Sequence, residues 1–296
     1  MTAFIELNRT SFMVEPICRT LEIAPSSYYA ARSRPLSARA IADEKLKPKI
    51  SEIHAENFAV YGARKVWHAL ARKGDHVGRD RVARLMGTLG LVGATRERSI
   101  RTTKPADQSA RPADLVERNF AAAAPNRLWV ADITYVWTTA GFCYTAFIVD
   151  VFSRRIVGWR TAVSLRTDLA LDALEMAIFA RGNDLLGLIH HSDRGVQYAS
   201  DGYYNLLSGR GMVPSMSRAG NPWDNAACES FMKTLKAEEV NGKAYASLEE
   251  LQADLAAFLD EYYNRCRLHS SLNYCAPEKF ERLHEAAAPS AAVMEF

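Results

Sequence analysis

The run at residues 129–137, Trp-Val-Ala-Asp-Ile-Thr-Tyr-Val-Trp, sets the strongest limit on the fold, because aromatic and β-branched residues favour strands. Gly141 marks a turn after it, and residues 142–152 and 155–160 predict two further strands. Connections this short join antiparallel neighbours. The chain is therefore expected to form an antiparallel meander that begins near its middle.

Helices and strands alternate after the meander. Hydrophobic periodicity and length predict a helix over 167–181, an apolar strand over 186–191, a helix over 200–207, a strand over 212–216 and a helix over 225–240. A further helix opens with a capping box from Ser247 to Glu250. Five strands with interspersed helices predict an α/β domain.

The first part of the chain is expected to be helical. Short helices are predicted at 14–21 and 26–32, and a clearer pair at 62–73 and 79–89 is joined by a turn and stopped by Gly90. In the second helix of this pair the apolar residues recur at i, i+3, i+4 and i+7, namely Val82, Leu85, Met86 and Leu89. Arg79, Arg81 and Arg84 lie off that stripe. The pattern indicates a DNA-binding helix-turn-helix, and a solvated basic face is the alternative.

Charge is divided unevenly along the chain. Residues 1–120 hold 21 Lys and Arg against 13 Asp and Glu, a net +8, whereas the remaining 176 residues hold 16 against 21, a net −5. A basic front suits a polyanion such as DNA. Residues 98–125 are basic and rich in Pro, Ser, Thr and Ala without periodicity, which indicates a linker.

Cellular setting is indicated by what the sequence lacks. No apolar run reaches the ~18 residues that a membrane span requires, and the amino terminus does not resemble a signal peptide. The five cysteines include no CxxC pair, which argues against a disulfide framework or a cysteine zinc site. We therefore expect a protein of a reducing cytoplasm with no membrane partner and no zinc.

Three carboxylates occupy unusual positions. Asp132 lies mid-strand in an apolar stretch, Asp193 lies where an apolar strand gives way to a loop, and Glu229 shares a helix face with Lys233 and Lys236. Each has an ordinary alternative. A strand-end Asp can cap a loop, and a helix Glu can pair with a Lys at i+4.

Two neighbouring features complicate this assignment. Asp150 also lies mid-strand and is a rival candidate ligand. His190 and His191 are adjacent on a strand and point to opposite faces, so they cannot both bind one metal; one is expected in the core and the other near the site.

Ordered motifs match a known family along nearly the whole chain. The matching segments are 61–64, 79–86, 125–135, 149–154, 191–198, 217–226 leading to Glu229, and 263–269. The chain resembles the catalytic frame of bacterial insertion sequences of the insertion-sequence-three family, which are relatives of retroviral integrases. Thirty-five residues separate Asp193 from Glu229, as in that family's D,D-35-E signature, and Lys236 matches a basic residue of the family on the same helix face.

The resemblance implies a ribonuclease-H-like core, a mixed five-stranded sheet with flanking helices, preceded by an all-α helix-turn-helix region. It implies a DDE transposase that cleaves DNA at insertion-sequence ends and transfers the 3′-hydroxyl into target DNA. Catalytic and metal-binding roles then fall to Asp132, Asp193 and Glu229, with two Mg²⁺ ions, replaceable by Mn²⁺. Asp132 is expected to bridge the ions, and the residues expected to contact DNA are Lys236, Lys233, Arg79, Arg81 and Arg84.

Domain and partner expectations follow from the same resemblance. We expect a helix-turn-helix region at 1–97, a basic linker at 98–125, an integrase-like catalytic domain at 126–284 and a flexible tail at 285–296. Expected partners are element-end and target DNA, further copies of the chain on DNA, and an upstream helix-turn-helix and coiled-coil frame product, which is fused or associated. The expected location is the bacterial cytoplasm, at the nucleoid. The alternatives are a ribonuclease-H-like nuclease that does not join strands and an inactive DNA-binding remnant. Arg265, Arg267 and His269 are interpreted as a motif that completes the domain.

Overall fold

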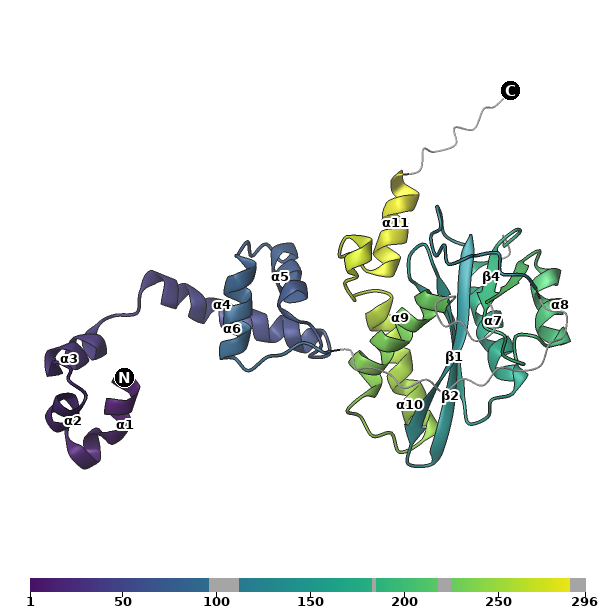
Figure 1. Cartoon of the computed structure of the whole chain (residues 1–296). Coiled ribbons are helices and arrows are strands. Elements are labelled where there is room, and N and C mark those ends of the chain that lie inside the picture. The colour runs from purple at the N-terminus through teal and green to yellow at the C-terminus, as the bar shows by residue number, and fades with distance from the viewer. Residues whose placement is uncertain (96–111, 183–184, 218–224, 288–296) are drawn as a thin grey trace, which may run out of the picture.

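The computed structural model describes residues 1–95, 112–182, 185–217 and 225–287 (Figure 1). Residues 98–111 of the expected linker and 288–296 of the expected tail lie outside these ranges, as do residues 218–224 of the motif before Glu229. In the described ranges no helix is long and apolar enough to cross a membrane.

The amino-terminal third is helical, as predicted. It contains α1 (Thr2–Phe12), α2 (Val14–Thr20), α3 (Pro25–Ser33), α4 (Ala38–Glu56), α5 (Ala63–Arg72) and α6 (Arg79–Thr88). The first three pack on one another through a small core of their own around Ile5, Cys18 and Tyr28. α5 and α6 confirm the predicted helix pair. The 19-residue α4 was not predicted, and it packs against both of them through Leu46, Ile50 and Ile53.

A five-stranded mixed sheet forms the centre of the molecule. Its strands are β1 (Leu128–Thr138), β2 (Gly141–Asp150), β3 (Ile156–Ala162), β4 (Ile189–Ser192) and β5 (Val213–Met216), in the order β3-β2-β1-β4-β5. β1, β2 and β3 are antiparallel neighbours, which confirms the meander, whereas β4 is parallel to β1 and β5 is parallel to β4. The predicted mixed sheet is therefore confirmed.

Helices cover both faces of the sheet (Figure 1). α7 (Thr167–Arg181) and α8 (Asp201–Gly209) lie on one face, and α9 (Ala226–Leu235) and α10 (Leu248–Ala256) lie on the other. β3 passes so close to α7 that a Cβ atom on Gly158 would lie 2.1 Å from the Ala173 carbonyl oxygen. Both faces are thus buried, and the site described below lies at the α9 side.

The two helices on the α9 side of the sheet continue as π-helical segments. α9 is followed by η2 (Lys236–Val240) and α10 by η3 (Ala257–Tyr263), so each predicted helix is longer than its α-helical part. Ser247 caps α10 by accepting a hydrogen bond from the Glu250 amide, as the capping box predicts.

The carboxy-terminal segment is more ordered than expected. A short 3-10 turn, η4 (Ser270–Leu272), leads to α11 (Pro277–Ala287), which was not predicted and runs three residues into the expected tail. Glu281 of α11 is buried and accepts hydrogen bonds from Ser153, Arg155 and Arg181. This network fixes α11 to the sheet and α7.

Part of the expected linker packs against the sheet. The Met216 amide donates to the Ala113 carbonyl oxygen, and the Leu115 amide donates to the Ser215 hydroxyl. Val116 is buried. Residues 113–116 therefore run along β5, so the linker predicted to end at residue 125 ends before residue 113.

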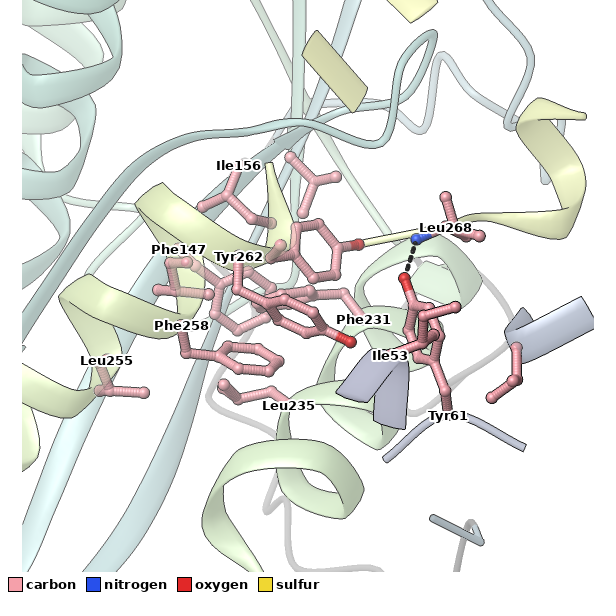
Figure 2. Close-up of a cluster of buried hydrophobic side chains, with 14 of the residues drawn as sticks. Ile53, Tyr61, Phe147, Ile156, Phe231, Leu235, Leu255, Phe258, Tyr262 and Leu268 are labelled. Carbon is pink, nitrogen blue, oxygen red and sulfur yellow. Dashed lines mark hydrogen bonds between the residues drawn. The ribbon is translucent and has the colours of Figure 1, made fainter. Parts of the chain in front are cut away.

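A shared hydrophobic core joins the helix-turn-helix region to the α9 side of the sheet (Figure 2). The Phe58 ring centroid lies 4.6 Å from that of Tyr262, and Tyr61 is 1% exposed. The Leu268 amide donates a 2.8 Å hydrogen bond to the Tyr61 hydroxyl. The two regions are thus packed as one body at this junction.

Candidate active site

Asp132 lies on the α9 face of β1. Its antiparallel partner is Phe147, which is buried in the α9-side core. Its Oδ1 accepts from the Ile133 amide at 2.8 Å, and its Oδ2 accepts from the Asn225 side-chain amide at 3.0 Å. The residue is partly exposed. Two donors from different elements therefore hold this carboxylate at the sheet surface.

Asp193 follows the end of β4, the parallel neighbour of β1. Val130 is paired with His191, and continuing that register by two residues sets Asp193 alongside Asp132. The Gly195 amide donates to Asp193 Oδ1 at 2.9 Å, and a Cβ atom on Gly195 would lie 2.9 Å from the same oxygen. A larger residue at this position would therefore require the Asp193 carboxylate to shift.

Glu229 lies in the first turn of α9. Lys233 Nζ donates to Glu229 Oε2 at 3.1 Å, which is the i, i+4 pair expected of a helix face. Lys236, at the end of the same helix, lies with its Nζ 4.7 Å from the ring centroid of Tyr135 on β1. The α9 surface beside β1 therefore presents one carboxylate and two amines.

The three carboxylates are electrostatically coupled. Burial, followed by the charges of Asp193 and Glu229, raises the pKa of Asp132 to about 8, against the lowering effect of the Ile133 amide and Asn225. Like charges at one place favour a cation. Across the described ranges, no three His, Cys, Asp or Glu side chains are gathered tightly enough to hold a metal ion. The carboxylates are thus interacting neighbours and not a closed ligand set.

Two unsatisfied polar atoms lie by the carboxylates. Asn225 Oδ1 and the Tyr198 hydroxyl are buried and have no hydrogen-bond partner in the described part of the chain. Burial raises the pKa of Tyr198, and the charges of Asp132 and Asp193 raise it further. A Cβ atom on Gly195 would contact both Asp193 Oδ1, at 2.9 Å, and the Tyr198 ring, at 3.6 Å. Hard carboxylate oxygens beside unsatisfied polar atoms suit hydrated Mg²⁺. Both residues belong to motifs quoted above, yet neither was assigned a role from the sequence.

Asp150, the rival carboxylate, has a structural role. It pairs with Trp129 in the sheet register and therefore faces the opposite side from Asp132. It is 0% exposed and accepts from the Asn126 and Phe152 amides and from Arg181. These contacts account for its burial without a metal.

His190 and His191 point to opposite faces, as predicted, but both are core residues. His190 Nε2 is 3.1 Å from the Tyr203 hydroxyl, and burial lowers the pKa of this imidazole to about 3. His191 Nδ1 is 2.9 Å from the Ser215 hydroxyl. His191 pairs with Val130 in the sheet register and therefore faces the α9 side, two residues before Asp193, so the expectation that one of the two lies near the site stays a prediction.

The three arginines of α6 differ in their surroundings. Arg81 and Arg84 both bind the Asp43 carboxylate of α4, at 2.7 and 2.5 Å. Arg79 is exposed and pairs with its neighbour Asp80. Arg81 and Arg84 therefore join α4 to α6, and a DNA contact by any of the three stays a prediction.

Comparison with known proteins matches both the sheet domain and the helical region to families of known transposases and integrases. The family model described as "Integrase core domain" matches residues 122–222, a second one with the same description matches 210–277, and one described as "HTH-like domain" matches 41–99. The chain is 40% identical over 292 residues to the transposase for insertion sequence element IS629 of Shigella sonnei, covering 97% of each chain. It is 45% identical over 271 residues to a Mycobacterium tuberculosis protein named for element IS986/IS6110, covering 90% of this chain and 97% of that one.

Solved structures resemble the sheet domain more distantly. The HTLV-2 integrase catalytic core domain in complex with magnesium aligns with a TM-score of 0.40 at 15% identity, covering 54% of this chain and 98% of that one. Similarity at this level supports no conclusion about function.

Proposed function

The chain belongs to the insertion-sequence transposases that carry an integrase core domain, and on that premise we propose that it cleaves and rejoins DNA at Asp132, Asp193 and Glu229. The supporting observation is the parallel register of β1 and β4, together with the coupling of the three carboxylates. These two findings support a shared site for residues from β1, the end of β4 and α9. The enzyme would be a polynucleotidyl transferase acting at the ends of its element.

Each carboxylate has a partner that would hold it in place for metal binding. The three would hold two Mg²⁺ ions, which when bound make an attacking oxygen more nucleophilic and stabilise the charge on a leaving oxygen. Asn225 and the Ile133 amide orient Asp132, and the Gly195 amide orients Asp193. Lys233 neutralises Glu229 until a cation takes that role.

Two displacements at phosphorus would use the same site. In the first, a water oxygen bonds to phosphorus at the element end, the bond to the 3′ oxygen breaks, and a 3′-hydroxyl is freed. In the second, that hydroxyl oxygen bonds to a target phosphorus and a target 3′ oxygen leaves. One phosphodiester forms as another breaks, so joining needs no external energy source. Lys236 and Lys233 would contact DNA phosphates beside the reacting bond.

The proposal extends to the remaining regions. Residues 1–97 would bind the element end through the helix-turn-helix, with Arg79 as its most exposed basic contact on α6. The chain would act as a homo-oligomer on DNA, together with or fused to an upstream frame product. The catalytic domain would begin by residue 113, because that segment already runs along β5.

The test is cleavage and joining by the full chain on labelled duplexes that carry the inverted repeats flanking its gene. Asp132→Asn should lower Mg²⁺-dependent cleavage by at least about 100-fold and leave end binding intact. Asp172 lies on α7, on the other side of the sheet from α9, and pairs with Arg160. The Asp172→Asn variant should therefore cleave like the parent. Retained cleavage by Asp132→Asn would refute the assignment.

The same assay separates the alternatives. A nuclease would release labelled ends without transferring them to target DNA, and an inactive remnant would bind without cutting. Transfer of the labelled 3′ end into target DNA is the expected result.

A further inference from the structure

A cavity of about 650 Å³ lies between the start of α5 and α9. Arg64 and Lys65 line it from the helix-turn-helix region, Ser230 lines it from α9, and His269 lines it from the segment after η3. Ser230 follows Glu229 directly in the chain. The cavity therefore connects the DNA-recognition region with the helix that carries a proposed catalytic carboxylate, yet it lies on a different face of that helix.

The cavity has an excess of positive charge. Four cationic side chains line it, Arg64, Lys65, Arg154 and Arg267, against one acidic side chain among its described lining residues, Glu238. Glu238 accepts two 2.6 Å hydrogen bonds from Arg267 and lies 3.5 Å from Lys65. Arg64 and Arg154 have no hydrogen-bond or ion-pair partner within the described ranges. Two guanidinium groups are therefore available to an anion.

His269 adds an unused donor to the cavity. It is 6% exposed, and Arg267 Nη1 lies 3.3 Å from both of its ring nitrogens. Burial lowers the pKa of His269 well below its usual value, and the charges of Arg267, Lys65 and Arg154 lower it further, so the ring is neutral. A neutral imidazole accepts at one nitrogen and donates at the other. Arg267 donates to the ring nitrogen that accepts, and no described residue accepts a hydrogen bond from the ring N–H.

The same wall contains a helix start. α5 begins at Ala63 behind Gly62, which has no side chain to cap the first amide groups, and both residues line the cavity. Uncapped amides at a helix N-terminus favour a negative group. The unpaired arginines, the His269 ring N–H and the helix start thus all favour an acceptor with negative charge.

We propose that this cavity binds a phosphodiester of DNA through Arg64, Arg154 and the His269 ring N–H. The occupied cavity would guide the strand from the helix-turn-helix region to α9. Arg267 would be a positioning residue, held by Glu238 so that it orients His269. The inference rests on the proposed function in that DNA is the substrate.

The experiment measures binding of a labelled duplex of about 30 base pairs to the full chain by fluorescence anisotropy, across a KCl series in EDTA. Each phosphate contact contributes a slope of about −0.9 in log affinity against log salt. Arg64→Gln and Arg154→Gln should each flatten the slope by about that amount and weaken binding about fivefold at roughly 150 mM salt. Arg160→Gln removes an exposed arginine outside the cavity and should leave the slope unchanged.

Slopes equal to the parent's in both cavity variants would overturn the proposal. Arg64 is exposed, so its variant keeps the test valid if Arg154→Gln unfolds. Stabilisation of the parent by inorganic phosphate that Arg154→Gln abolishes, with DNA binding unchanged, would also overturn it by assigning the cavity to small anions. Because EDTA prevents cleavage, a failure of the carboxylate assignment cannot change this result.

Discussion

Asp132 should destabilise the metal-free protein as pH rises, and its replacement by Asn should remove that effect. The structure raises the pKa of this carboxyl from its usual value near 4 to about 8. Between these values the folded chain binds a proton that the unfolded chain has lost. The stability of the parent therefore falls as pH increases through this window, whereas the Asp132→Asn variant lacks this dependence because an amide does not titrate.

The size of the effect follows from the two pKa values. At about 1.4 kcal/mol for each factor of ten in proton affinity, the full difference corresponds to roughly 5 kcal/mol at pH 8. Asp132 is partly exposed, so solvent and counterions screen its interactions. We therefore expect the Asp132→Asn variant to gain roughly 1–3 kcal/mol relative to the parent between about pH 5 and pH 8.5.

Urea unfolding of both proteins in EDTA at several pH values measures this difference. The variant also loses an acceptor for Asn225, which shifts its stability by a similar amount at every pH. The change of the difference with pH is thus the diagnostic quantity. A difference that stays constant from about pH 5 to pH 8.5 would show that folding does not raise the pKa of Asp132.

Three further predictions concern the site and the fold. Gly195→Ala sets a Cβ atom 2.9 Å from Asp193 Oδ1 and should reduce cleavage roughly 10- to 100-fold with little change in melting temperature. Gly209 has open space around it, so Gly209→Ala should cleave like the parent, and equal rates in the two variants would contradict the close contact between Gly195 and Asp193. Lys236→Ala should flatten the salt dependence of DNA binding by about one counterion, and an unchanged slope would argue against a phosphate contact. Glu281→Gln removes the charge that pairs with Arg181 and Arg155 and leaves Asp150 as the described carboxylate partner of Arg181. It should cost about 3 kcal/mol by urea unfolding, well above the cost of the more exposed Glu278→Gln, and similar losses would contradict the buried network.

Much of the sheet domain was predictable because its elements have strong local signals. Thr167–Arg181 forms the predicted helix with the same bounds, and the β-branched runs became β1, β2 and β3. α4 was missed because Pro48, a residue that usually ends helices, lies inside it and many of its residues are charged, so its apolar positions Leu46, Ile50 and Ile53 are a weak signal. Such a helix is stabilised by tertiary packing and not by its own pattern.

The site shows where local signals end. Asp132 and Asp150 are both carboxylates in apolar strands, and no local feature distinguishes them. Strand register does, because it turns Asp132 toward α9 and Asp150 toward α7 and its Arg181. Asn225 contacts Asp132, which lies 93 positions earlier in the chain, and His269 shares a cavity with Arg64 and Arg154, which are farther away still. Only the fold brings these residues together, so their roles could not be predicted from local sequence.

The proposed function depends above all on Asp132, Asp193 and Glu229 forming one divalent-metal site. Electron paramagnetic resonance titration with Mn²⁺ counts bound ions directly in the parent and in Asp132→Asn, Asp193→Asn, Glu229→Gln and the control Asp172→Asn. We predict that each of the first three variants loses Mn²⁺ binding and that the control binds like the parent. Unchanged binding in all three carboxylate variants would show that these side chains do not share a metal.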